Sequence, residues 1–165
     1  MGRSLVVGAL VTAAMSLAAC HSADDAPEQQ WSLVQNHFYI ERMPKSERDM
    51  VKDIAFIDHE DAGKIGIDAV ASRFRFVVDT LKWQRRGNTI NMRVLQSQQD
   101  RSATFRAWRC KDKAPFELCL ELKNGDRTMR YYSKNDWIIE RASDVEKLAA
   151  MLPLDPDASP DASAD

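Results

Sequence analysis

Two cysteines, Cys110 and Cys119, have the spacing with the clearest chemistry in this 165-residue chain. Each lies in a strand-like segment, and Lys111–Pro115 between them has the composition of a turn. If the segments pair as a hairpin with the two cysteines opposite each other, Ala107 lies opposite Leu122 and the leucine face stays whole. We therefore expect a disulfide bond, which for a loop of this length stabilises the fold by roughly 2–3 kcal/mol.

Metal and cofactor chemistry has less support in the sequence. Two cysteines without a nearby histidine do not complete a zinc site. The segment Asp58–Ile65 has acids at the first and third positions of a calcium-loop pattern and Gly63 at the sixth. However, Ala62 and Ala69 occupy the fifth and twelfth positions, where oxygen ligands are needed. An acidic turn is the better interpretation, and we expect no metal or cofactor.

Catalytic motifs are also missing from the sequence. The sequence contains neither a Gly-x-Ser-x-Gly nucleophile elbow nor a His-Glu-x-x-His zinc-protease motif. Of the three histidines, His21 lies in the tether, and neither His37 nor His59 has a known nucleophile setting. Glu117 and Glu121 lie on one face of a predicted strand, but Arg130 is expected nearby across a hairpin. Ion pairing explains these acids better than proton transfer does.

Five arginines in neighbouring segments have the chemistry to bind an anionic partner, such as the phosphates of lipopolysaccharide. The alternative is the solvated outer face of a sheet, with the aliphatic stems packed flat. The five residues are Arg73, Arg75, Arg85, Arg86 and Arg93.

Charge is unevenly distributed along the chain. Residues 31–152 hold 22 Lys and Arg against 18 Asp and Glu, whereas the flanks, 20–30 and 153–165, hold seven acids and no base. This mild balance is unlike the basic stripe of a nucleic-acid-binding protein, so no nucleic-acid partner is expected. The flanks contain little apolar material, which predicts a polar tether and a disordered acidic tail.

The N-terminus has the order of a secretory signal. Arg3 precedes an apolar run, Leu5–Leu17, which small residues connect to Cys20. The run is too short for a helix across ~30 Å of hydrocarbon, which needs ~20 residues. Residues 1–19 are therefore expected to be a cleaved signal peptide.

The sequence Leu17-Ala18-Ala19-Cys20 resembles the lipobox of bacterial lipoproteins. The resemblance implies cleavage before Cys20 and acyl chains on that cysteine, and several chains together anchor a protein stably. His21 stands where an aspartate would retain such proteins in the inner membrane of enteric-type bacteria. The expected location is the cell envelope, at the outer membrane facing the periplasm.

Between the flanks, residues 31–152 are expected to form one β-rich domain. The clearest alternation of apolar and polar residues runs from Phe116 to Leu122, and Asn124-Gly125 suits a tight hairpin turn. Arg86-Gly87-Asn88 marks another turn, and a change of parity at Asp79-Thr80 predicts a bulge or a break.

Two helices are predicted beside the strands. Ser46–Val51 suits a short helix that begins at Ser46. The second runs from about Asp144 to Leu152, where Ser143 and Glu146 form a capping-box pattern and Pro153 ends the helix.

The predicted fold is mainly β, an antiparallel up-and-down meander that closes into a small barrel with a short C-terminal α-helix. Trp31 near the start, the hairpins and the terminal helix make the layout similar to small lipocalin-like envelope barrels. That resemblance implies a ligand cup. The alternative is an α+β arrangement, a curled open sheet with the helix packed on it.

These features favour a lipid-anchored binding or interaction module without catalysis. Its partner would be another envelope protein, peptidoglycan, or a small apolar ligand inside the barrel. The alternative is an envelope enzyme whose site is assembled from scattered residues.

Overall fold

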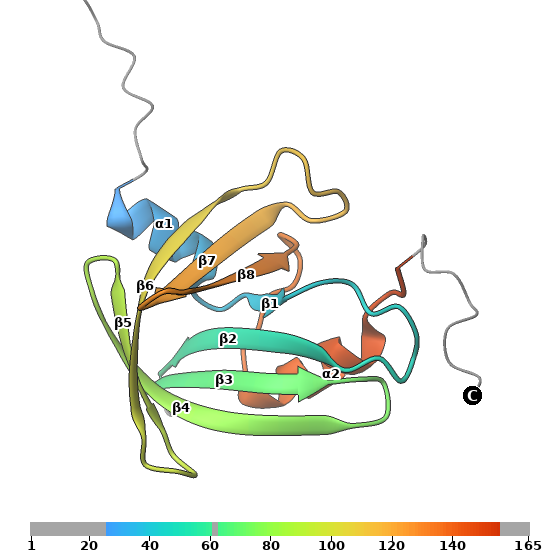
Figure 1. Ribbon diagram of the computed structural model, residues 1–165, viewed down its shortest axis with the longest axis horizontal. Helices are drawn as coiled ribbons and strands as arrows, with labels where there is room; N and C mark the ends of the chain where they lie inside the picture. Colours follow the sequence, from blue (N-terminus) through green and yellow to red (C-terminus); the bar gives the residue numbers. More distant parts are fainter. Residues whose placement is uncertain (1–25, 61–62, 156–165) are drawn as a thin grey trace, which may run out of the picture.

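The computed structural model describes residues 26–60 and 63–155. No helix within these ranges is long and apolar enough to cross a membrane. Along the chain the elements are α1 (Pro27–Val34), β1 (Phe38–Ile40), β2 (Val51–His59), β3 (Gly63–Ala71), β4 (Phe76–Arg86), β5 (Thr89–Val94), β6 (Asp100–Arg109), β7 (Leu118–Asn124), β8 (Arg127–Ser133) and α2 (Ala142–Met151) (Figure 1).

Each strand pairs antiparallel with the next, and β8 pairs with β1, which closes the barrel. The closing contact is short: Ile40 lies opposite Tyr132, and the Ser133 hydroxyl donates a 2.6 Å hydrogen bond to the Phe38 carbonyl. Closure removes exposed sheet edges. The predicted up-and-down barrel with a C-terminal helix is confirmed, and the open-sheet alternative does not hold.

Helix α1 completes the barrel interior. Trp31 and Val34 are buried in the interior cluster, where the Trp31 ring lies 5.0 Å from Trp83 and 5.3 Å from Phe105, between centroids. Pro27 is the first helical residue, a position where its missing N–H costs nothing. Residues 27–30 of the segment 20–30, which the sequence had suggested as a tether, thus belong to a helix packed on the barrel.

Helix α2 covers the outer face of the barrel over β2 and β3, where Val145, Ala149 and Leu152 join a second apolar cluster. Strand β4 runs without interruption through Asp79-Thr80, so the predicted bulge or break is wrong. The parity changes because Val78 packs outward in this second cluster, whereas the next apolar residues of the strand face the interior.

The predicted short helix at Ser46–Val51 is wrong, because this segment forms a turn. The Asp49 carboxylate holds the turn by accepting hydrogen bonds from the Arg42 guanidinium and from the Lys45 N–H. Those bonds compete with a helix for the same backbone.

The start of α2 also differs from the prediction. Its reciprocal cap joins the N–H of Arg141 to the Asp144 carboxylate at 2.9 Å, and the N–H of Asp144 to the Arg141 carbonyl, also at 2.9 Å. The helix therefore begins at Ala142, two residues before the predicted start.

The predicted disulfide between Cys110 and Cys119 is confirmed, with 5.4 Å between the Cα atoms. Its predicted register is wrong, because Ala107 lies opposite Leu120 and Cys119 lies opposite Trp108. Cys110 follows the last residue of β6, so the bond runs diagonally across the strand ends. The two-residue difference keeps every side chain on its face, which is why the parity argument did not detect it.

Candidate ligand-binding cup

The barrel interior opens at the end opposite α1 into a cavity of about 870 Å³, which we call the cup. Its floor is made of buried apolar side chains from four strands: Ile54, Leu81, Ala103 and Leu122. Because side chains alternate along a strand, residues two apart face the same side, as Asp79 and Leu81 of β4 do in the cup.

Charged groups line the mouth of the cup. Asp68 of β3 lies opposite Asp79 of β4, and the Arg101 guanidinium of β6 reaches both carboxylates, at 3.2 Å and 4.0 Å respectively. Burial raises the pKa of Asp68 above its usual value, while the positive charge of Arg101 acts in the opposite direction. Burial and the charge of Arg101 thus act in opposite directions on the ionisation of Asp68, and a polar group on a ligand would change both effects.

A tyrosine and two methionines also line the wall of the cup. The Tyr131 hydroxyl donates to the Met129 sulfur at 3.7 Å, and Met92 lines the same cavity. Burial strongly raises the pKa of Tyr131, so its hydroxyl keeps its proton at neutral pH. Methionine side chains adapt to irregular apolar shapes. This wall suits an apolar body that has one hydrogen-bonding group.

Helix α1 fixes the closed end of the cup. The Gln30 side-chain oxygen accepts a 3.2 Å hydrogen bond from the backbone N–H of Ala107 in β6. Arg85 of β4 pairs with Glu28 at 2.6 Å, and its guanidinium lies 5.3 Å from the Trp31 ring centroid. These backbone and charge contacts hold α1 in place, so Arg85 has a structural role.

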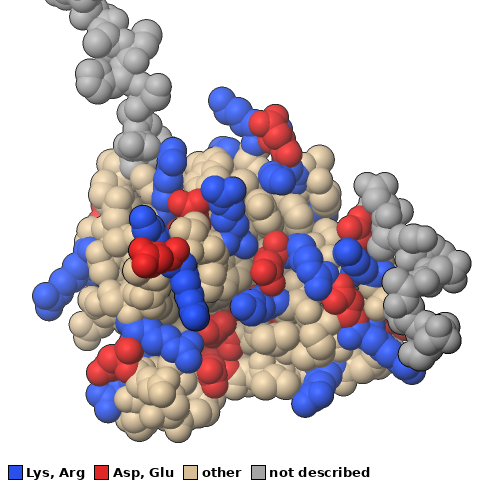
Figure 2. All heavy atoms as spheres, in the orientation of Figure 1, with Lys and Arg blue, Asp and Glu red and all other residues tan. Residues whose placement is uncertain are grey.

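The structure does not gather the five arginines that the sequence suggested as a patch. Arg73 and Arg75 lie at the β3–β4 turn, whereas Arg86 ends β4 at the opposite end of that strand. Arg85 is occupied by Glu28, and Arg93 binds the Gln98 side-chain oxygen. Figure 2 shows basic and acidic side chains interspersed on the face that it presents.

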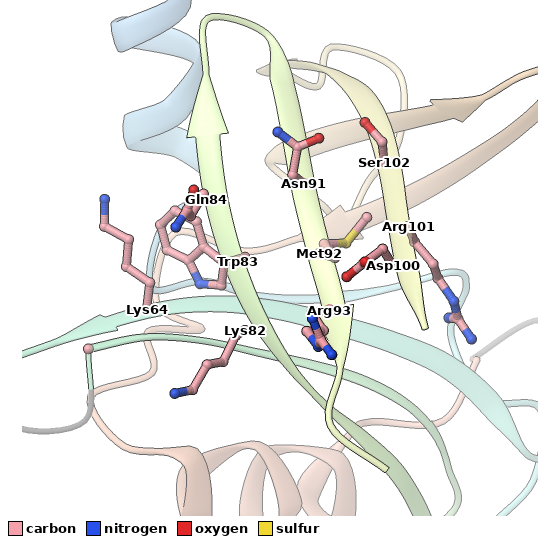
Figure 3. Close-up of a pocket in the computed structure, with 11 residues that line it drawn as sticks. Lys64, Lys82, Trp83, Gln84, Asn91, Met92, Arg93, Asp100, Arg101 and Ser102 are labelled. Carbon is pink, nitrogen blue, oxygen red and sulfur yellow. The ribbon is translucent and has the colours of Figure 1, made fainter. Parts of the chain in front are cut away.

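A second hollow, of about 810 Å³, lies at β4, β5 and β6 near the start of β3 (Figure 3). Two exposed polar rows cross these strands, and Lys64 reaches over the Trp83 ring at the edge. The rows are Lys82, Arg93 and Asp100, and Gln84, Asn91 and Ser102. Such a surface hydrogen-bonds readily to water, so the cup, with its buried apolar floor, is the stronger candidate.

The other chemically capable residues have structural contacts. His37 Nδ1 lies 3.0 Å from the Gln35 carbonyl oxygen. Glu121 forms the expected ion pair with Arg130 at 3.0 Å, and Glu117 accepts a hydrogen bond from the N–H of Asn135. Within residues 26–60 and 63–155, no three His, Cys, Asp or Glu side chains gather as a metal site requires.

Two candidate sites from the sequence lie partly or wholly outside the described residues. Cys20, the expected lipidation site, precedes the described part of the chain. In the segment Asp58–Ile65, His59 ends β2 and Gly63 begins β3 with a positive φ of 69°, which makes a β-hairpin. Asp61 and Ala62 are not described.

Sequence reasoning missed two acids in the barrel wall, the half-buried Asp68 and the buried Asp53. Asp68 was not singled out as a cup residue, and Asp53 lies fully buried on the outer face of β2. The signal was an acid inside an apolar run: Asp68 follows Ile67, and Asp53 precedes Ile54. Comparison with known proteins adds no further assignment, since no protein family, no curated protein and no solved structure matches this chain.

Proposed function

We propose that the protein is a lipid-anchored module of the cell envelope that binds a small, largely apolar ligand in the cup. The single observation that carries this proposal is the cavity of about 870 Å³ with a buried apolar floor inside the closed barrel. Small-molecule sites typically have volumes of roughly 300–1,000 Å³, apolar walls and a few polar groups.

The arrangement of the cup favours an amphiphile. Its apolar body would lie against Leu81 and Leu122, where it removes hydrocarbon from water. A polar group at the mouth would meet the Arg101 guanidinium and the carboxylates that it bridges. These side chains are each 34–44% exposed, so a polar group of the ligand could exchange with their present partners without burying an unpaired charge.

Filling the cup is expected to weaken ligand binding. Met129 and Val77 both line the cup and are partly exposed, so a Met129→Trp or Val77→Trp side chain has room to enter it. We expect each variant to weaken binding of 1-anilinonaphthalene-8-sulfonate, an apolar fluorophore with one anionic group, at least tenfold. Fluorescence titration of the unlipidated chain measures the effect.

Thr128→Trp is the matched control, because Thr128 is exposed and neighbours Met129 on the other face of β8. It adds the same ring outside the barrel and should leave the titration unchanged. Equal binding by the cup variants and the control, with all of them folded by circular dichroism, would show that the fluorophore binds elsewhere. Mass spectrometry of protein purified from membranes then identifies the natural ligand.

The lipid anchor is the second part of the proposal, and the lipobox at Leu17–Cys20 supports it. Cys20 precedes Pro27, the first residue of α1, by seven residues. A chain spans at most ~3.3–3.6 Å per residue, so the anchor would hold the barrel within roughly 25 Å of the membrane surface.

Replacing the anchor cysteine is expected to abolish lipidation of the protein. A Cys20→Ala chain lacks the thiol that carries the lipid, so it should remain as an unprocessed precursor or appear in the soluble fraction. Cell fractionation and intact mass measure this result. A chain with both Cys110→Ala and Cys119→Ala is the control, since it loses the disulfide but keeps the lipobox. Unchanged processing and an unchanged lipid mass in Cys20→Ala would exclude the lipoprotein assignment.

A further inference from the structure

Three segments far apart in the sequence meet at one edge of the barrel: residues 44–48, 71–75 and 149–154. Residues of all three line one small gap. The N–H of Arg73 donates to the Glu47 carbonyl at 3.1 Å, and the two side chains form an ion pair. Figure 1 shows the β1–β2 connection, the β3–β4 turn and the C-terminal end of α2 together at this edge, which we call the corner.

The corner exposes large apolar side chains. Phe74 at the tip of the β3–β4 turn and Met151 at the end of α2 are each 68% exposed, and Leu154 is 40% exposed. Ile138 is an exposed apolar residue elsewhere, beside His37. Three large exposed apolar residues around one contact between segments are more than the scattered single residues that a soluble surface normally carries.

The turn that presents Phe74 is held in one conformation. The Ser72 hydroxyl accepts hydrogen bonds from the N–H of Phe74 at 3.3 Å and of Arg75 at 3.1 Å. The N–H of Ser72 donates to the Arg75 carbonyl at 2.7 Å. Little conformational entropy would therefore be lost when the ring enters an apolar environment.

Positive charge surrounds these apolar groups. The corner segments contain four basic side chains and one acidic side chain, and Asp155 follows directly. The acidic side chain, Glu47, is neutralised by Arg73. Within the described residues, Arg48 and Arg75 are exposed and have no ion-pair partner. The other two basic residues of the corner segments are Lys45 and Arg73.

We propose that the corner docks on an anionic lipid bilayer. Phe74 would enter the interfacial region, where an aromatic ring is favourable, while the arginine stems lie along the surface with their guanidinium groups at the lipid phosphates. Lys45 and Arg48 of the neighbouring segment add attraction of the same sign.

The experiment uses the unlipidated chain from His21 to Asp165, which contains every described helix and strand, so that binding reports the corner and not the anchor. It is sedimented with vesicles of phosphatidylethanolamine and phosphatidylglycerol at 7:3, and with vesicles of phosphatidylcholine alone. We expect binding to the anionic vesicles that weakens with added salt, and little binding to the neutral ones.

Phe74→Ala should weaken the partition coefficient on anionic vesicles about tenfold, since it removes most of the inserted apolar area. Arg75→Glu should weaken it at least as much. Ile138→Ala, at an exposed apolar site away from the corner, is the matched control and should bind like the unmodified chain.

The proposal fails if the unmodified chain binds neither kind of vesicle, if it binds both equally, or if Ile138→Ala loses as much binding as Phe74→Ala. Fluorophore titration of the cup in Phe74→Ala separates the two proposals. Normal cup binding with lost vesicle binding supports the corner on its own, whereas loss of both would show that the variant has disturbed the fold and would overturn its assignment to docking.

Discussion

Ending the chain at Arg141 should lower the free energy of unfolding by roughly 4–6 kcal/mol. The truncation removes α2, and with it Val145, Ala149 and Leu152, which are buried against the outer faces of β2 and β3. Burying one Val or Leu side chain is worth roughly 1.5–3 kcal/mol. The loss also exposes the apolar surface that the helix covers, which favours aggregation.

Urea unfolding of unlipidated chains that end at Asp165, Asp155 and Arg141 measures this effect. The chain ending at Asp155 keeps every described residue and should lie within about 1 kcal/mol of the full chain, since exposed ion pairs to the acidic tail are worth about 0–1 kcal/mol each. A tail deletion as damaging as the helix deletion would show that residues 156–165 are structural. Equal stability of all three chains would show that α2 contributes no packing energy.

The barrel could be predicted because its signals are local. Alternating apolar residues mark strands, and Gly87 and Gly125, both with positive φ, lie in the tight turns that join them. A series of short strands connected by turns leaves few topologies, and closure removes the exposed edges. The disulfide followed from the same alternation, because Cys119 lies on β7 and Cys110 directly follows β6, the strand that pairs with β7.

The features that the sequence did not predict depend on contacts between distant residues. Phe76 and Val78 look out of phase within β4 because the covering layer of α2 comes from more than 60 residues along the chain. Helix α1 begins in a polar segment, and only the place of Trp31 between Trp83 and Phe105 explains why it is ordered. Neither contact leaves a periodic signal.

The candidate site shows the same difference between local signals and contacts of distant residues. A cup was expected from the barrel, but its charged mouth was not. Asp68 and Asp79 pair across adjacent strands, and Arg101 of β6 reaches them only when the sheet curls. The predicted arginine patch was wrong for a different reason: residues close in the sequence lie far apart in the fold. Proximity in sequence placed Arg75 and Arg86 together, whereas the length of β4 separates them.

Asp53 is the site of the second large expected effect, a loss of stability as the pH rises. Its side chain lies on the outer face of β2 between Ile40 of β1 and Ala69 of β3, and the residue is 1% exposed. Within the described residues, its Oδ1 atom has no hydrogen-bond partner. A carboxylate without partners in an apolar layer is costly, so the protonated form is favoured.

Burial raises the pKa of Asp53 from 3.8 to about 7, with a smaller contribution from the negative charge of Asp68. The folded state therefore holds a proton between about pH 4 and pH 7 that the unfolded state has released. Stability from this group is fully present below the unfolded pKa and is lost as the pH rises through the folded one. At about 1.36 kcal/mol for each pKa unit, the total is roughly 4 kcal/mol, of which about 3 kcal/mol falls between pH 5 and pH 8.

Asp53→Asn replaces the carboxyl by a neutral group of the same shape and should remove this dependence. We expect the free energy of unfolding of the variant, relative to the unmodified chain, to rise by roughly 3 kcal/mol from pH 5 to pH 8. Asp49→Asn is the control: the Arg42 guanidinium lowers the pKa of Asp49 to about 2, so this acid is ionised in both states across that range. Its variant should be destabilised by the same amount at both pH values. If Asp53→Asn also shows a constant difference, Asp53 is ionised in the folded protein and must have a partner or water that compensates its charge.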